Sequence, residues 1–181
     1  FYLVPLGAAG TVLMMIGWAQ LFYTPEKTGT AMTVCVGFCA LFIGTTEVAR
    51  RLGRNSPLLG QTAIVLPVVA FCFAWCFLSF PAVAAQTVLF FSYVSLVSVG
   101  VFFLAWREKL GELIAGTAGV SALLIMRWSA QTFTAVQMPA AMTVCLFFCV
   151  LYLVVYLFAR RHESVTPYVY WSAVGLPVLA L

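Results

Sequence analysis

The sequence predicts an all-α fold, a polytopic membrane helical bundle of about seven transmembrane helices built as a parallel tandem repeat of a four-helix unit. Apolar residues make up 64% of the 181 residues and charged residues only 8%, and the mean hydropathy is +1.09. A soluble domain has about a quarter of its residues charged, so this chain has too few charged residues to form a surface that faces water. Two further observations predict this fold class: the long apolar segments and an internal repeat.

Seven segments are long and apolar enough, or nearly so, to cross the roughly 30 Å of a bilayer's hydrocarbon, which takes about 20 helical residues. The apolar runs are continuous, whereas the strands of a membrane barrel alternate between apolar and polar residues. Proline or charged residues separate the runs. We expect helices over residues 2–23, 30–49, 61–80, 86–106, 112–130, 139–159 and 167–181.

The chain matches itself at an offset of 110 residues. Residues 31–39 read AMTVCVGFC and residues 141–149 read AMTVCLFFC, and 22 of the 71 pairs between residues 1–71 and 111–181 are identical without a gap. A match at fixed spacing indicates a duplicated unit. We predict one unit over 1–110 and a second over 111–181, cut after its third span, together forming one membrane domain of a longer chain. Four spans per unit make the two copies parallel, unlike the inverted repeats of many transporters.

Basic residues gather on one side of the predicted membrane. The connections after the second, fourth and sixth spans should face the cytoplasm, because cytoplasmic loops carry an excess of Lys and Arg. The N-terminus of the segment is then cytoplasmic as well. The basic residues on that side are Arg50, Arg51, Arg54, Arg107, Lys109, Arg160 and Arg161, against Lys27 and Arg127 on the other. They do not form one basic face, so no nucleic acid partner is expected; the expected partners are the lipid bilayer and further spans of the same chain or other membrane proteins.

All six cysteines occur in i,i+4 pairs within predicted spans, and two interpretations are open. Thiolates bind Cu(I), whereas cysteine as a small residue lets membrane helices approach closely. No histidine accompanies the pairs, and a bare thiolate is costly in hydrocarbon. We therefore favour packing and predict no metal and no cofactor. The pairs are Cys35/Cys39, Cys72/Cys76 and Cys145/Cys149.

Three serines and two prolines are the candidates for a transport path. Ser92, Ser95 and Ser98 recur every three residues in the fourth span. They line a path for a polar solute or hydrogen-bond to a neighbouring helix, and we favour the second interpretation. Pro67 and Pro177 interrupt the third and seventh spans at equivalent repeat positions. Each proline removes a backbone hydrogen bond and bends its helix, which marks a binding site in some repeat transporters and otherwise shapes the bundle.

Ionisable residues within the predicted spans are few. Glu47 precedes Arg50 and Arg51 by three and four residues, which predicts ion pairs on one helix face. Arg127 should reach the interface opposite the cytoplasm by extending its side chain along the helix. We hypothesise that it pairs there with Glu26.

No catalytic constellation occurs in the sequence, which has no Ser/His/Asp set and no Gly-rich phosphate loop. We therefore predict that the protein is not an enzyme. The first functional hypothesis is a membrane scaffold or envelope-associated component that acts by packing against other spans. The alternative is a transporter or flippase for a lipid-like or small polar substrate.

Two sequence runs carry a resemblance to a known family. Residues 18–27 (WAQLFYTPEK), residues 104–109 (LAWREK) and the tandem four-span period resemble a family of large, many-spanning bacterial predicted inner-membrane proteins of unknown function. The likeness covers most of the 181 residues. It implies a multi-pass protein of the inner (plasma) membrane with more spans than these, and it brings no catalytic residues. The second copy departs from the first at residues 134–137, which replace the Thr-Pro-Glu-Lys of residues 24–27.

Overall fold

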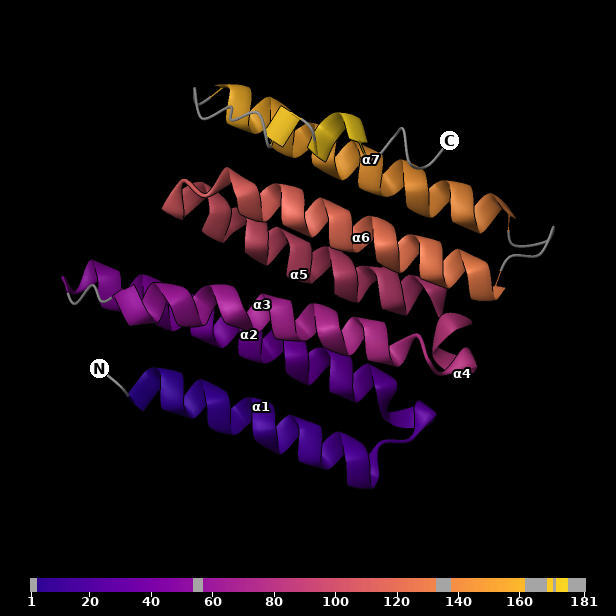
Figure 1. The fold of residues 1–181 in the computed structure, drawn as a ribbon, viewed down its shortest axis with the longest axis horizontal. Helices are drawn as coiled ribbons and strands as arrows, with labels where there is room; N and C mark the ends of the chain where they lie inside the picture. Colours follow the sequence, from indigo (N-terminus) through magenta and orange to yellow (C-terminus); the bar gives the residue numbers. More distant parts are fainter. Residues whose placement is uncertain (1–2, 54–56, 133–137, 162–168, 171, 176–181) are drawn as a thin grey trace.

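The protein folds as an all-α bundle. A computed structural model describes residues 3–53, 57–132, 138–161, 169–170 and 172–175, and none of these residues forms a strand. The predicted fold class is thus confirmed. The elements are α1 (Leu3–Phe22), the short 3₁₀ helix η1 (Pro25–Lys27), α2 (Thr28–Arg51), α3 (Pro57–Phe77), α4 (Pro81–Ala84), α5 (Thr87–Glu108), α6 (Gly111–Thr132) and α7 (Met138–Arg161) (Figure 1).

Five of the described helices, α1, α2, α5, α6 and α7, are long and apolar enough to cross a membrane. Each falls on one predicted segment. The described part of α3 contributes a shorter apolar stretch, Thr62–Phe77. The seventh predicted span, 167–181, lies mostly outside the described residues, so the count of seven stays a prediction.

The chain between the third and fourth predicted spans differs from the prediction. We expected one helix over 61–80, but α3 ends at Phe77 and a separate short helix, α4, begins at Pro81. Phe80 is extended, with φ −105° and ψ 114°, and Pro81 is the first residue of α4. A proline restricts the residue before it to extended backbone and is well suited to a helix's first position. Pro81 therefore both ends the preceding turn and starts α4.

The connection between α5 and α6 is only two residues long. Lys109 adopts a left-handed conformation, with φ 57°, at the end of α5. The backbone N–H of Leu110 then donates to the Ala105 carbonyl over 2.9 Å, the six-to-one bond of a Schellman motif. This turn brings α6 back antiparallel to α5.

The helix α5 is the centre of the bundle. It packs against α2, α3, α4, α6 and α7, whereas α1 packs chiefly against α3. In Figure 1, α1 and α7 lie at opposite edges, with α2 and α3 and then α5 and α6 between them. Residues buried on α5 occur along its whole length, from Phe90 to Ala105. The central helix therefore joins the two halves of the bundle.

Three contacts hold neighbouring helices to α5. The Tyr93 hydroxyl donates to the Ala70 carbonyl on α3 over 2.7 Å. A Cβ added to Gly100 would lie 3.3 Å from the Ile43 side chain on α2, so glycine permits this close approach. The Phe91 ring meets Trp128 on α6 edge to face, with ring centroids 5.2 Å apart. Each contact fixes a different partner of the central helix.

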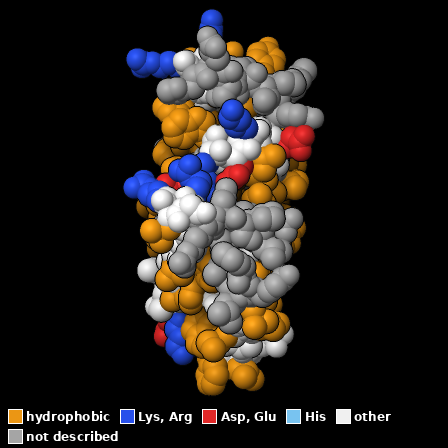
Figure 2. All heavy atoms as spheres, turned by 90° about the vertical axis from the view of Figure 1, so that its left-hand side faces the viewer, with side chains coloured by type: hydrophobic (Ala, Val, Ile, Leu, Met, Phe, Trp, Pro, Cys, Tyr) orange, Lys and Arg blue, Asp and Glu red, His pale blue; other side chains and the backbone are white. Residues whose placement is uncertain are grey.

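Most of the described charged side chains lie at one end of the bundle. The last turns of α2 and α7 carry Arg50, Arg51, Arg160 and Arg161, and all three of α2, α5 and α7 end on the same side (Figure 1). Figure 2 looks onto this end and shows basic and acidic side chains among hydrophobic ones. We call it the basic end.

The helices α2 and α7 lie at equivalent positions of the predicted repeat. The described part of α2 covers residues 28–51 and that of α7 covers residues 138–161, so a helix occupies equivalent positions of the two predicted units. The limits of α7 adjoin residues outside the described ranges, and the repeat stays a prediction.

Candidate functional site

The three predicted serines of α5 lie in three different environments. Ser92 is exposed, Ser95 is half-buried and Ser98 is fully buried, with 0% of its surface accessible. The Ser95 and Ser98 hydroxyls each donate to a carbonyl four residues earlier on α5, over 2.6 and 2.8 Å. Such back-bonding satisfies a hydroxyl inside an apolar environment. The structure does not bring these serines together along one path.

Ser98 belongs to a buried polar cluster with Ser121 of α6 and Tyr152 of α7. The Ser121 and Tyr152 hydroxyl oxygens are 3.5 Å apart, and Ser98 lies near the Tyr152 hydroxyl. Ser121 is 0% exposed and Tyr152 1%. The cluster therefore joins three helices, which is the role of an interhelical contact in a membrane protein.

Replacing Tyr152 with phenylalanine is expected to destabilise the bundle modestly. The change removes one hydroxyl from the buried polar cluster and keeps the ring, which packs 5.1 Å from Phe102. Polar contacts between membrane helices contribute about 0.6–2 kcal/mol, so the free energy of unfolding in mixed micelles should fall by that amount. Tyr156→Phe on the same helix, at a half-buried position, is the control and should have little effect. Equal effects of the two changes would contradict the assignment.

Pro67 lies on the wall of a cavity, whereas Pro177 lies outside the described residues. Pro67 is inside α3 and is buried. The cavity has a volume of about 390 Å³. We call it the α3–α6 groove, because α3 and α6 form its walls and α5 its floor; it is lined by Ile64, Pro67, Val68, Phe71, Cys72, Trp75, Val101, Leu104, Glu112, Leu113, Gly116, Thr117, Val120, Leu123 and Leu124.

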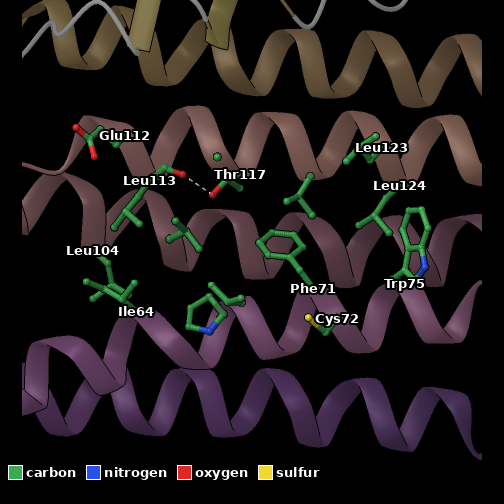
Figure 3. A pocket seen from close by; sticks show the side chains of 15 residues that line it. Ile64, Phe71, Cys72, Trp75, Leu104, Glu112, Leu113, Thr117, Leu123 and Leu124 are labelled. Carbon is green, nitrogen blue, oxygen red and sulfur yellow. Dashed lines mark hydrogen bonds between the residues drawn. The ribbon is translucent and has the colours of Figure 1, made fainter.

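The α3–α6 groove extends along the helices. Figure 3 shows Glu112 at one end, Phe71 and Cys72 midway and Trp75 at the other end. Its lining is almost wholly apolar, and the one internal polar group, the Thr117 hydroxyl, donates to the Leu113 carbonyl over 2.7 Å. A chamber of this kind suits an apolar occupant better than a hydrated one.

A second cavity, with a volume of about 300 Å³, lies between α1, α2 and α3. Trp18, Cys35, Phe38 and Phe77 are among the residues that line it. Its lining is also apolar. Neither of these two cavities provides a polar route past Pro67.

The cysteine pairs differ in burial. Cys35 and Cys39 are buried in the core, Cys72 and Cys76 are exposed, and the third pair is half-buried. All six are free thiols. Among the described residues, no group of three or more His, Cys, Asp or Glu side chains comes together as a metal site. The buried pair on α2 packs in the helix interface, as a small residue does.

The predicted ion pairs of Glu47 are confirmed, and the structure adds a third partner. The Glu47 carboxylate lies 3.0 Å from Arg50 and 2.8 Å from Arg51. It also accepts from Arg107 of α5 over 3.4 Å, and Arg107 in turn binds Glu108 over 2.7 Å. The Arg107 side chain is only 11% exposed. This charged cluster links α2 to α5 at the basic end.

Arg127 has different partners from the one we hypothesised. Its guanidinium lies 4.2 Å from the centre of the Trp75 ring and donates to the Ser79 hydroxyl over 2.9 Å. In the described part of the chain, its contacts are therefore with the end of α3 rather than with Glu26. The sequence offered no signal for this pairing, since Trp75 and Ser79 are about 50 residues away.

Two further contacts were also missed. The Trp128 indole N–H donates to the Ala84 carbonyl at the end of α4 over 2.9 Å. The repeat provided a partial signal, because Trp18 and Trp128 are equivalent. Tyr152 is equivalent to Phe42, so its hydroxyl, and with it the buried polar cluster, is particular to the second copy.

Comparison with protein-family models, with curated proteins and with solved structures finds no match for the chain. The conclusions on function therefore depend on the residues and their geometry.

Proposed function

We propose that this chain is an integral membrane repeat protein that acts as a scaffold or envelope-associated component of the inner (plasma) membrane of bacteria, without catalysis. Its partners are the lipid bilayer and further membrane spans, from the same chain or from other proteins. The basic end and the N-terminus of the segment face the cytoplasm. The resemblance to the many-spanning bacterial family supports this location, and the grouping of Arg and Lys at one end supports the orientation.

One observation carries the proposal: buried polar side chains bind neighbouring helices or the backbone of their own helix. Tyr93, Trp128 and the Ser121–Tyr152 pair bind neighbouring helices, and the Ser98 hydroxyl binds its own backbone. A transport path for a polar solute needs hydrogen-bonding groups that face water. The α3–α6 groove and the second cavity are apolar, which favours packing over transport of a polar solute.

Thiol labelling separates the scaffold from the alternative. In a background in which the six native cysteines are alanine, Ser95→Cys should not react with a membrane-impermeant maleimide, because the scaffold leaves residue 95 without contact to water. Arg51→Cys and Arg161→Cys lie at exposed helix ends and should react fast. Labelling of Ser95→Cys at a rate near that of these controls would favour transport instead.

The same controls test the orientation and the parallel repeat. Arg51 and Arg161 occupy equivalent positions in the two units, and the sequence match at an offset of 110 residues supports the duplication. Both positions should label only from the cytoplasmic side in oriented vesicles, whereas Lys27→Cys should label from the opposite side. Labelling of Arg51 and Arg161 from opposite sides would mean that the copies are inverted.

A further inference from the structure

The end of the α3–α6 groove beside Trp75 carries a positive charge. The Arg127 guanidinium lies over the Trp75 ring at 4.2 Å, and Trp75 lines the groove. The ion pairs of the described residues involve Arg50, Arg51 and Arg107, so no described carboxylate neutralises Arg127. A guanidinium has five N–H donors, and the bond to Ser79 uses one of them. Arg127 can therefore bind an anion while it keeps its place on Trp75.

The groove is longer than one leaflet is deep. On α6 its lining runs from Glu112 to Leu124, a distance of about 18 Å at 1.5 Å per residue. One leaflet provides roughly 15 Å of hydrocarbon, half of the core's thickness. Tryptophan and arginine near the end of a membrane helix lie at the level of the lipid headgroups. The groove thus runs from the headgroup level at Trp75 toward the middle and far side of the bilayer.

A whole helix does not fit inside the groove. A helix about 10 Å wide and 18 Å long fills roughly 1,400 Å³, whereas the whole empty space of the groove, its open mouth included, is about 1010 Å³. An extended hydrocarbon chain is narrow enough to enter. Between its two ends the groove offers a hydrated solute little to bind, because the Thr117 hydroxyl is bonded to its own helix.

We propose that the α3–α6 groove binds an anionic phospholipid, with one acyl chain between α3 and α6 and the phosphate on Arg127. Arginine binds phosphate through paired, charge-assisted hydrogen bonds. Glu112, at the opposite end, repels an anionic headgroup, so the two ends of the groove give the lipid one direction. An acyl chain gains little by leaving other acyl chains for an apolar wall. The headgroup charge therefore decides which lipid is retained. This inference goes beyond the proposed scaffold and does not depend on it.

The headgroup part of the proposal is tested by native mass spectrometry of the purified chain in detergent, with equal amounts of phosphatidylglycerol and phosphatidylcholine added. The wild type should retain one phosphatidylglycerol in preference to phosphatidylcholine, and Arg127→Gln should lower that preference by roughly tenfold, the effect of one charge-assisted contact. Arg127→Lys keeps the charge and should therefore keep part of the preference for phosphatidylglycerol. A preference unchanged in Arg127→Gln would overturn the proposal.

The acyl-chain part is tested by filling the groove. A Cβ on Gly116, which lines the groove, meets no atom within 4 Å, so Gly116→Phe places a ring in open space. Gly119 on the same helix has equally open surroundings but does not line the groove, and Gly119→Phe is the matched control. Thermal unfolding of both variants checks the fold. Loss of the retained phosphatidylglycerol in Gly116→Phe alone is the expected result. Equal retention in the two variants would mean that the lipid binds elsewhere on the surface.

Discussion

Replacing Trp128 with alanine is expected to lower the free energy of unfolding by about 3–5 kcal/mol, the usual cost of removing a fully buried aromatic ring. Trp128 is 1% exposed. Its ring packs against Phe91 with a centroid distance of 5.2 Å, and its N–H holds the Ala84 carbonyl. The change leaves a cavity between α5 and α6 and a carbonyl without its partner. Unfolding by SDS in mixed micelles, followed by circular dichroism, measures the loss.

The repeat provides the control for this prediction. Trp18 is the equivalent of Trp128, but it is only half-buried and meets Tyr23 at a ring distance of 6.5 Å. Trp18→Ala should therefore cost about 1 kcal/mol, the middle of the range for single substitutions. Trp128→Phe should lie between the two, since it keeps most of the packing and loses a hydrogen bond of about 1 kcal/mol. If Trp18→Ala and Trp128→Ala lowered the free energy of unfolding equally, the deeper burial of Trp128 would not be the source of its contribution to stability.

Replacing Gly100 with leucine is expected to destabilise the protein by about 1–3 kcal/mol, the cost of overpacking a close contact. The space beside Gly100 is taken by the Ile43 side chain of α2, 3.3 Å from where a Cβ would lie. A leucine there must push α2 away from the central helix. Gly37→Leu on α2, where a Cβ meets no atom within 4 Å, is the matched control. The same unfolding assay should find it neutral or stabilising, because leucine has the higher helix propensity.

Hydropathy predicted the long helices well because length and apolar composition are local properties of the sequence. A span needs a fixed number of apolar residues whatever its neighbours are, and α1, α2, α5, α6 and α7 each coincide with an expected segment. The break at Pro81 was also predicted, but the third span was drawn to residue 80, whereas α3 ends at Phe77 and the short helix α4 follows. Pro81 restricts Phe80 to extended backbone and begins α4.

The serines of α5 illustrate what a spacing alone cannot decide. Three residues rotate a helix by about 300°, so each step in the series turns back by roughly 60° and the whole series by roughly 120°. Ser92 and Ser98 therefore face different surroundings, and one is exposed while the other is buried. Which of them meets a partner depends on where α6 and α7 pack. That information is not local to α5.

The partners of Arg127 depend on the same non-local geometry. The sequence placed Arg127 near the end of its span, and any acidic residue on that side was a plausible partner. The alignment of α3 with α6 instead puts Trp75 and Ser79 beside it. The ion pairs of Glu47 with Arg50 and Arg51 were predictable, because both partners lie within one helical turn.

The central position of α5 also determines when the protein can fold during its synthesis. The ribosome completes α3 at residue 77 and α5 at residue 108, an interval of roughly 2–6 s at about 5–20 residues per second. During that time α2 and α3 enter the bilayer without the helix that covers their inner faces. Until α5 follows, the Ala70 carbonyl on α3 lacks the Tyr93 hydroxyl and the Ile43 side chain on α2 lacks its contact with Gly100.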